Sequence, residues 1–364
     1  MLKITIIAGA RPNFMKIAPI IHAIQKAKQE NFDIDYRLVH TGQHYDKNMS
    51  DSFFEQLEIP EPHVNLECSG GTQAEQTAAI MINFEKELMA NPASLVLVVG
   101  DVTSTMACAL VAQKLHTKVA HVEGGIRSDD WSMPEEINRL VTDSITNCFF
   151  TTSETANTNL KQSGVKDEQI FFVGNTMIDT LLKQHPNFKQ PKVWKELDLN
   201  EGNYIVMTLH RPANVDEESQ LKDMIDEIIT NTQDLPLIFP VHPRTAKILE
   251  RLNVSYSRLH MVAPLSYLEF NYLVEKAKAV ITDSGGITEE ASIMRVPCLT
   301  LRDNTERPET ITLGTNELVG TNPKHLKPYL NKLFDGNWKQ GQDIPLWDGK
   351  TANRIIKALL EIEN

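Results

Sequence analysis

Three acidic residues in the first half of the sequence stand where a sheet-based enzyme can carry acid and base chemistry. Asp101 follows the apolar run LVLVV, and Glu123 follows KVAHV. Asp101 would also suit a helix N-cap, but the Thr and Ser residues after it can fill that role, so we favour chemistry. Glu123 precedes two glycines, where an acid adds little stability. Glu135 follows Pro134 in a predicted first helical turn, where acids are common for structural reasons alone. Carboxylates at strand ends suit general acid and base catalysis.

Glycines and cations follow other apolar runs and indicate anion binding. In AVITDSGGITEEAS, an apolar run ends in Ser284, Gly285 and Gly286, and a predicted helix begins at once. Backbone amides at such a helix start suit a diphosphate, because glycines let the oxygens approach and the helix dipole favours anions. Glu290 in that helix is either a structural acid or a ligand contact. Further candidates at the ends of predicted strands are Arg11, Lys16, His210, Arg211, His242 and Arg302.

The composition excludes several classes of partner. With 36 basic and 48 acidic residues the net charge is −12, so no basic excess is present to bind nucleic acid or an anionic membrane. Cys68, Cys108, Cys148 and Cys298 lie far apart without metal-ligand spacing, so we expect neither disulfides nor a metal. No signal peptide pattern and no run of roughly 18 apolar residues is found. We therefore expect a cytoplasmic protein that binds a small anionic ligand.

The elements that position these residues alternate between apolar strands and amphipathic helices. This alternation predicts the α/β class, with parallel sheets covered by helices on both faces. The pattern restarts after the polar stretch HPNFKQPKVWKELDLNEGN, so we expect two doubly wound domains. The predicted domains are residues 1–172 together with a C-terminal helix at 350–364, and residues 173–349. A G-x-G-x-x-G fingerprint is absent after every predicted strand, which argues against a nicotinamide, and we expect no cofactor.

Seven strings, in order, resemble the non-hydrolysing UDP-N-acetylglucosamine 2-epimerases. They are GARPNFMKIAPI, TGQH, HVEGGIRS, MPEEINR, LHRPANVD, TDSGGITEEAS and RDNTERPE, and the resemblance runs from about residue 8 to residue 322. It implies a GT-B architecture, in which two Rossmann-like domains hold the active site in a cleft between them. It also implies a homodimer and a role in cell-surface polysaccharide biosynthesis.

The resemblance also implies a role for individual residues. Asp101, Glu123 and Glu135 match the family's catalytic carboxylates, and His210 matches its essential histidine. Arg11 and Lys16 match basic residues of the sugar-nucleotide site, and Arg302 is expected near the phosphates. The turn Ser284, Gly285 and Gly286 matches the diphosphate-binding turn, with Glu290 on the ribose hydroxyls.

The reaction implied is inversion at carbon 2 of a UDP-sugar, from UDP-N-acetylglucosamine to UDP-N-acetylmannosamine. The hydrogen on carbon 2 is not next to a carbonyl, so the family eliminates UDP to form a glycal and then adds it back. Asp101, Glu123 and Glu135 would share the acid and base roles, while cations stabilise the diphosphate.

Several alternatives remain open from the sequence. A hydrolysing epimerase would release N-acetylmannosamine and UDP, and a GT-B glycosyltransferase would use the same glycine turn. A non-catalytic UDP-sugar sensor is the third. The exact UDP-sugar is open, and so is a regulatory UDP-sugar site beside the TGQH segment.

Overall fold

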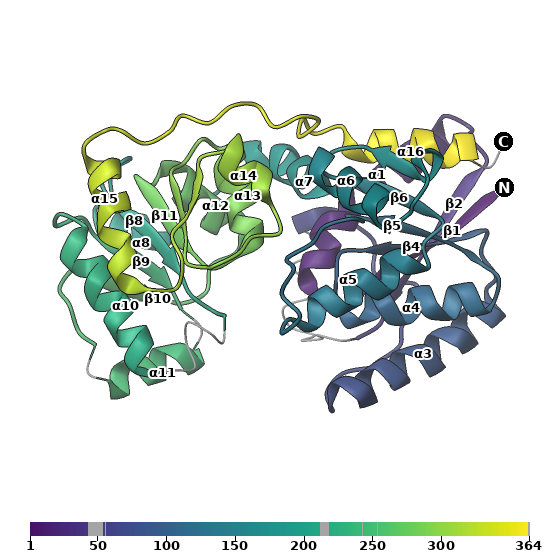
Figure 1. Cartoon of the computed structure of the whole chain (residues 1–364), viewed down its shortest axis with the longest axis horizontal. Coiled ribbons are helices and arrows are strands. Elements are labelled where there is room, and N and C mark those ends of the chain that lie inside the picture. The colour runs from purple at the N-terminus through teal and green to yellow at the C-terminus, as the bar shows by residue number, and fades with distance from the viewer. Residues whose placement is uncertain (43–53, 55, 212–217, 242, 253, 363–364) are drawn as a thin grey trace. The chain divides into compact units, whose positions relative to one another are not determined.

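The computed structural model describes residues 1–364 except 43–53, 55, 212–217, 242, 253 and 363–364. The chain divides into two compact units, each built around one parallel sheet (Figure 1). The first unit is Met1–Thr180 with Pro345–Asn364, and the second is Leu181–Ile344. The predicted α/β class with two doubly wound domains is confirmed. The functional division at 1–172 with 350–364 and 173–349 stays a prediction.

The first unit contains a seven-stranded sheet in the order β3-β2-β1-β4-β5-β6-β7. Every pairing in it is parallel. The strands are β1 Leu2–Ala8, β2 Ile34–His40, β3 Val64–Asn65, β4 Leu95–Val99, β5 Lys118–Val122, β6 Cys148–Thr151 and β7 Ile170–Phe172. The central strand β4 is buried along its whole length, as expected of a parallel strand covered on both faces.

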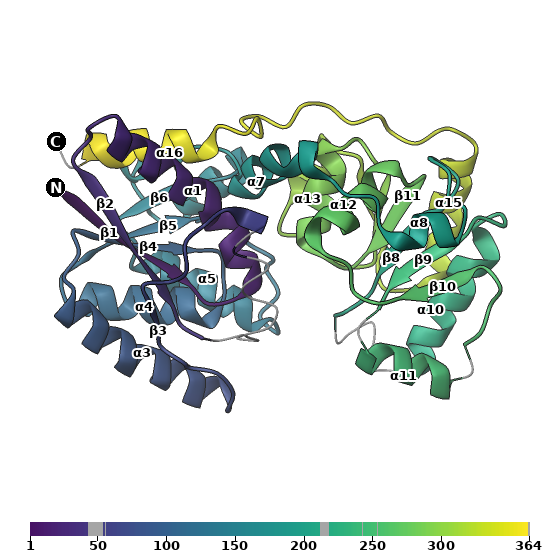
Figure 2. The ribbon, with the colours of Figure 1, turned by 180° about the vertical axis from the view of Figure 1, so that it is seen from behind.

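Helices cover both faces of this sheet, as Figures 1 and 2 show from opposite sides. One layer contains α3 Gln73–Ala90, α4 Thr103–Lys114 and α5 Pro134–Ser144. The other contains α1 Arg11–Gln29, α6 Glu154–Gln162, α7 Thr176–Gln184 and α16 Thr351–Ile362. The C-terminal helix α16 lies against α1, and the Asp179 carboxylate of α7 accepts hydrogen bonds from the backbone amides of Thr351 and Ala352. This contact caps the start of α16 and joins it to the first unit.

The second unit repeats the plan with a six-stranded parallel sheet in the order β10-β9-β8-β11-β12-β13. Its strands are β8 Ile205–Thr208, β9 Leu237–Pro240, β10 Leu259–Val262, β11 Ala279–Thr282, β12 Cys298–Thr300 and β13 Asn316–Leu318. Its helices are α8 Lys192–Glu196, α10 Glu218–Asn231, α11 Pro243–Arg251, α12 Tyr267–Lys276, α13 Gly285–Ile293, α14 Pro308–Thr312 and α15 Leu326–Phe334. Two apolar cores flank this sheet, one beneath α10 and α15 and the other beneath α12 and α13.

Two kinds of feature are absent from the part of the chain that the structure describes. Within it, no helix combines the length and apolar character needed to cross a bilayer. The same residues contain no group of three or more His, Cys, Asp or Glu side chains arranged to hold a metal ion.

Candidate active site

Asp101 and Glu123 lie at the carboxyl ends of neighbouring strands in the first unit. Strands β4 and β5 pair in parallel with Val99 opposite Val122, so the residues that follow them emerge side by side. The Gly100 amide donates to the Val122 carbonyl at 3.0 Å, which extends the pairing one step beyond β4. This is the edge at which ligands of doubly wound sheets bind. Sequence reasoning therefore placed both carboxylates at the correct edge of the sheet.

Glu123 is a buried carboxylate held in an unusual backbone conformation. Its φ is 72°, a left-handed value that costs a non-glycine residue free energy and that is often retained at functional sites. Only 4% of the residue is exposed. Its Oε2 accepts a hydrogen bond from Lys16 Nζ of α1 at 2.8 Å. One of the predicted catalytic carboxylates and a predicted basic residue thus form an ion pair, although 107 residues separate them in the chain.

Gly100 leaves room for this ion pair. A Cβ at Gly100 would lie 3.2 Å from Lys16 Nζ and 4.0 Å from Glu123 Oε2, and its φ of 67° already favours glycine. Asn13 arranges the preceding loop, because its Oδ1 accepts from the amides of Gly9 and Ala10 while its Nδ2 donates to the Val99 carbonyl. A side chain at position 100 would therefore crowd Lys16 against Glu123.

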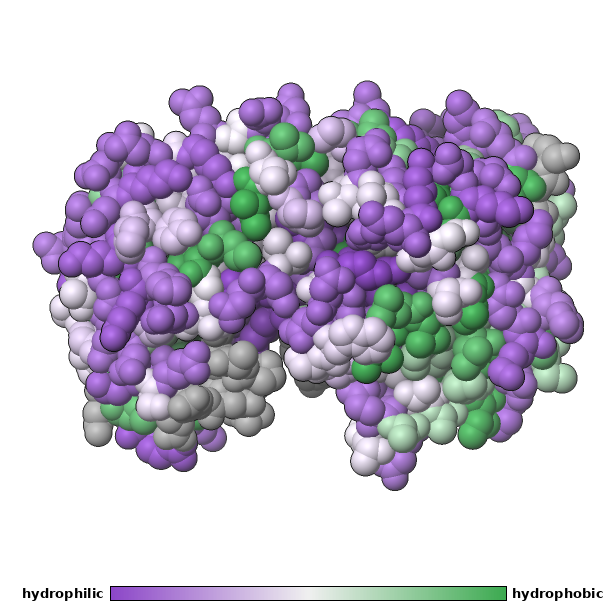
Figure 3. Space-filling model, in the orientation of Figure 1, coloured by the Kyte–Doolittle hydropathy of each residue, from purple (hydrophilic) through white to green (hydrophobic). Residues whose placement is uncertain are grey.

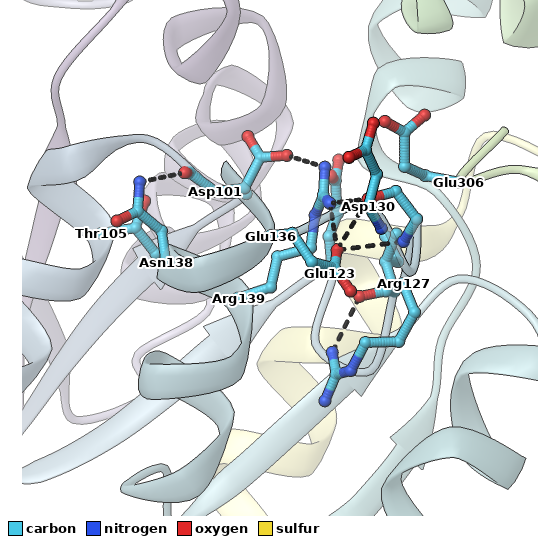
Figure 4. Close-up of polar contacts among 12 residues, drawn as sticks. Asp101, Thr105, Glu123, Arg127, Asp130, Glu136, Asn138, Arg139 and Glu306 are labelled. Carbon is cyan, nitrogen blue, oxygen red and sulfur yellow. Dashed lines mark hydrogen bonds and ion pairs between the residues drawn. The ribbon is translucent and has the colours of Figure 1, made fainter. Parts of the chain in front are cut away.

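Arg139 of α5 is a site residue that the sequence reasoning missed. Its guanidinium donates to Asp101 Oδ2 at 2.5 Å and to Glu136 Oε2 at 2.6 Å, as Figure 4 shows. Glu136 also accepts from the amide and the hydroxyl of Ser128, so Arg139 connects Asp101 to the loop before α5. The available signal was the spacing in MPEEINR, because Glu136 and Arg139 lie three residues apart and share one helix face.

The two acids at the start of α5 differ in their surroundings. Glu136 is 1% exposed, and its carboxylate is held by Arg139 and Ser128. Glu135 is only partly buried in the same first turn. Beside them, Asn138 Nδ2 donates to the Asp101 backbone carbonyl at 2.9 Å. Helix α5 therefore holds Asp101 by both its backbone and its side chain.

Arg11 is the first residue of α1 and is exposed at the surface of the first unit. Lys16, one and a half turns further along α1, is brought to Glu123 as described above. The structure thus joins Lys16 with one of the predicted carboxylates.

In the second unit, His210 and Arg211 follow β8 and are held by Asp283. Asp283 is completely buried, and its carboxylate accepts from the backbone amides of both residues. The His210 Nδ1 lies 2.8 Å from Asp283 Oδ1, while 61% of the His210 side chain is exposed. Arg211 Nε also donates to the Asp283 backbone carbonyl. Asp283 thus orients His210 and Arg211 beside the turn Ser284, Gly285 and Gly286, which it directly precedes.

The turn Ser284, Gly285 and Gly286 opens α13 beside a pair of guanidinium groups. Arg302 donates two hydrogen bonds of 2.7 Å to Glu306, and Arg211 Nη2 lies 3.8 Å from Glu306 Oε1. A Cβ on Gly285 would lie 3.9 Å from Arg302 Nη1. The structure therefore brings Arg211, Arg302 and the glycine turn together at a helix N-terminus, which is a favourable place for an anion.

Glu290 is buried in α13, and its surroundings change its acidity. Burial raises its pKa to about 7, although hydrogen bonds from Tyr267 and Asn271 oppose that shift. The Tyr267 hydroxyl donates to Glu290 Oε1 at 2.7 Å. His242 lies outside the described residues, and so do residues 43–46, which are the end of TGQH and the two residues after it.

Comparison with known proteins gives the same family along nearly the whole chain. Residues 25–360 match the model of the UDP-N-acetylglucosamine 2-epimerase family. The chain is 42% identical to the UDP-N-acetylglucosamine 2-epimerase of Methanocaldococcus jannaschii, covering 98% of this chain and 99% of that one. It is 39% identical to the UDP-2,3-diacetamido-2,3-dideoxy-D-glucuronate 2-epimerase of Pseudomonas aeruginosa, with 88% of each chain covered.

Solved structures agree with these sequence matches. The chain superimposes with a TM-score of 0.88 on the crystal structure of the Methanocaldococcus jannaschii UDP-GlcNAc 2-epimerase in complex with UDP-GlcNAc and UDP. The two are 40% identical over 99% of this chain and 100% of that one.

Proposed function

Because the chain belongs to the UDP-N-acetylglucosamine 2-epimerase family, we propose that it interconverts UDP-N-acetylglucosamine and UDP-N-acetylmannosamine. Its GT-B-like fold supports this proposal. The observation that carries it is the pair of carboxylates at adjoining strand ends, each ion-paired to a cation: Glu123 to the mostly buried Lys16, and Asp101 to the buried Arg139. The enzyme is an isomerase in this proposal.

The chemistry follows from the weak acidity of the carbon-2 hydrogen. A base removes that proton, the C–H electron pair becomes the double bond between carbons 1 and 2, and the bond from carbon 1 to the diphosphate oxygen breaks. UDP leaves with the electron pair of that bond, and a glycal remains. In the return step UDP adds to carbon 1 while an acid protonates carbon 2 on the opposite face. Atoms and charge balance without an oxidant.

The first unit is proposed to supply the proton-transfer groups, namely Asp101, Glu123 and Glu135. An ammonium paired with Glu123 favours the ionised carboxylate, which is the form that a base requires. Arg139 gives Asp101 a similar ionic partner. Asp101 and Glu135 are both partly exposed, whereas Glu123 is buried. Variants of Asp101 and Glu123 would distinguish which group acts on which face of the sugar.

The second unit is proposed to bind UDP. The turn Ser284, Gly285 and Gly286 would receive the diphosphate, with Arg211 and Arg302 beside it. His210, oriented by Asp283, would stabilise the negative charge that develops on the leaving group. Glu290 would bind the ribose hydroxyls. The division into a carboxylate domain, 1–172 with 350–364, and a UDP domain, 173–349, is part of this proposal.

Proton NMR in deuterium oxide tests the function directly. Purified protein with UDP-N-acetylglucosamine should form UDP-N-acetylmannosamine, with deuterium at carbon 2 of both sugars. Release of free N-acetylmannosamine and UDP would instead indicate the hydrolysing reaction. Binding without deuterium exchange would indicate a sensor or a different sugar, and the diacetamido uronate relative makes the corresponding UDP-sugar the next substrate to try.

The pKa of Glu290 predicts that UDP binds more tightly in alkaline solution. Ribose hydroxyls donate to an ionised carboxylate, and a group with a pKa of about 7 is mostly protonated at pH 6 and mostly ionised at pH 8. The dissociation constant for UDP should therefore fall by up to about tenfold between these pH values. Titration calorimetry of the wild type and of Glu290→Gln measures this change. The variant controls for the ionisation of UDP itself, and an equal pH dependence in both proteins would contradict the role of Glu290.

The same raised pKa makes Glu290 a source of pH-dependent stability. The folded protein binds the proton up to about pH 7, whereas an unfolded glutamate loses it near pH 4.5. The stabilising contribution is thus complete below pH 4.5 and is lost as the pH rises through about 7. Relative to Glu290→Gln, the wild type should lose thermal stability over that interval. Melting curves at pH 5 and pH 8 provide the comparison.

We also propose that two copies of this chain form a homodimer through the α3, α4 and α5 layer. Ile82 is 55% exposed and Met89 is 66% exposed on α3, and Ile137 of α5 is 43% exposed. Figure 3 shows apolar side chains gathered over this region. An exposed apolar patch of this kind is typical of an interface.

The double substitution Ile82→Glu and Met89→Glu should therefore yield monomers, because each added charge would have to be buried without a partner. Sedimentation velocity measures the oligomeric state. Thr158→Glu on α6, which lies on the opposite face of the sheet, is the control and should leave the oligomeric state unchanged. A double variant with the wild-type sedimentation coefficient would exclude this surface as the interface.

Within the same proposal, the enzyme works in the cytoplasm and supplies a sugar for cell-surface polysaccharides. The four cysteines are buried free thiols, as a reducing compartment allows. Burial raises the pKa of the Cys148 and Cys298 thiols to about 12, so they stay protonated and unreactive.

A further inference from the structure

His121 is a buried histidine between the two catalytic loops, and no step of the proposed reaction uses it. It lies in β5, two residues before Glu123, and its side chain is completely buried. Its Nε2 lies 2.8 Å from the Gly100 carbonyl oxygen, and its Nδ1 lies 2.7 Å from Asp143 Oδ1 of α5. The ring therefore spans the distance between the end of β4 and helix α5.

Both partners of the ring are hydrogen-bond acceptors. A backbone carbonyl can only accept, so Nε2 must carry a proton. Asp143 is held as a carboxylate: burial alone raises its pKa, but His121 and Arg127 together bring it below the ordinary value. The other oxygen of Asp143 already accepts from the Gly125 amide at 3.0 Å and from Arg127 at 2.6 Å.

Glycine at position 124 is needed for this arrangement. A Cβ there would lie 2.8 Å from the Phe149 ring and 3.4 Å from both Asp143 Oδ1 and His121 Nδ1. The glycine pair after Glu123 thus lets the chain pass close over the His121 and Asp143 contact. Gly124 in the string HVEGG is therefore required by close packing, and not only by backbone flexibility.

Helix α5 holds both catalytic loops through the same set of contacts. Asn138 and Arg139 hold the backbone and the side chain of Asp101. Five residues after Asn138, Asp143 binds His121 and the Gly125 amide, which flank Glu123 in the sequence. The His121 ring also contacts the backbone carbonyl of Gly100, the residue directly before Asp101. One imidazole therefore links the loop that carries Asp101 to the strand that carries Glu123.

We propose that His121 is a positioning residue, and that its ring contacts with the Gly100 carbonyl and the Asp143 carboxylate set the separation between Asp101 and Glu123. The proposal rests on the proposed epimerase function for its kinetic consequence, but the hydrogen bond from Nε2 to Gly100 does not depend on it. The groups that face the ring are the Asp143 carboxylate, the Arg127 guanidinium bound to it and the Gly100 carbonyl.

Nitrogen-15 NMR of labelled histidines in the full-length protein tests the contact with Gly100. The Nε2 atom of His121 should be protonated, because it donates to a carbonyl oxygen, and its signals are identified by their loss in His121→Asn or His121→Gln. An unprotonated Nε2 on His121 would overturn the proposal whether or not the variants fold well enough for kinetics.

Two substitutions test the positioning role. Asparagine can still donate to Asp143 but does not reach Gly100, whereas glutamine reaches Gly100. His121→Asn should lower kcat by about 100-fold, because displacing a catalytic group by about 1 Å has an effect of this size. His121→Gln should retain more activity and stay within about tenfold of the wild type. The KM should change by no more than about twofold in both, since UDP is bound elsewhere.

His116→Asn is the matched control, because His116 is exposed in a turn with a φ of 58° that asparagine tolerates. It should leave kcat unchanged. If His121→Asn kept kcat within about twofold of an active wild type, or raised KM alone, the positioning role would be wrong. If the wild type shows no epimerisation while Nε2 of His121 is protonated, the proposed function fails and the contact with Gly100 stands.

Discussion

Replacing Glu123 with glutamine is expected to lower kcat for epimerisation on the order of 10³-fold, while UDP still binds. The amide keeps the shape of the side chain but cannot accept the carbon-2 proton, and general acid and base catalysis contributes effects of about this size. Glutamine also breaks the ion pair with Lys16, which leaves a mostly buried ammonium beside a neutral amide. Initial rates from NMR, with UDP titrations in parallel, separate catalysis from binding.

Deuterium exchange at carbon 2 makes the Glu123 experiment more specific. If Glu123 acts on only one face of the sugar, Glu123→Gln should slow exchange from one epimer more than from the other, and Asp101→Asn should show the reverse preference. Glu168→Gln, in an exposed turn of the same unit, is the matched control and should retain wild-type rates. Wild-type exchange in Glu123→Gln would remove Glu123 from the reaction.

Replacing Arg139 with lysine is expected to lower kcat by about 100-fold even though the charge is conserved. The planar guanidinium donates to Asp101 and to Glu136 with separate nitrogens, and the single ammonium of a shorter side chain does not reproduce that fork. Asp101 would then lose the contact that holds its side chain. Steady-state rates with both epimers measure the effect, and an unchanged kcat would show that Asp101 does not depend on Arg139.

Arg139→Met extends this test to stability. Glu136 is almost fully buried, and removing its cation should lower the free energy of unfolding by about 3–5 kcal/mol. Chemical denaturation measures the difference. Arg258→Met, which breaks a surface ion pair with the exposed Asp234, is the control and should cost about 1 kcal/mol or less. Equal losses in the two variants would show that the Arg139 network contributes no more than a surface pair.

The sequence by itself determined the α/β class, the two doubly wound domains and the residues that end each strand. Burial on both faces of a parallel sheet requires continuous apolar runs, and these are local patterns that a single segment displays. Asp101, Glu123, His210 and the glycine turn were located in this way, because each begins within two residues of the end of such a run.

Only the tertiary structure decided which side chains meet at those strand ends. Lys16 and Glu123 are 107 residues apart, and Asp101 and Arg139 are 38 apart, so their pairing depends on how helices pack on the sheet. The neighbouring acids of α5 also show that packing, and not residue type, decides which side chains meet. Glu135 and Glu136 have identical chemistry, but successive helical residues point about 100° apart, and packing alone buried Glu136 against Arg139.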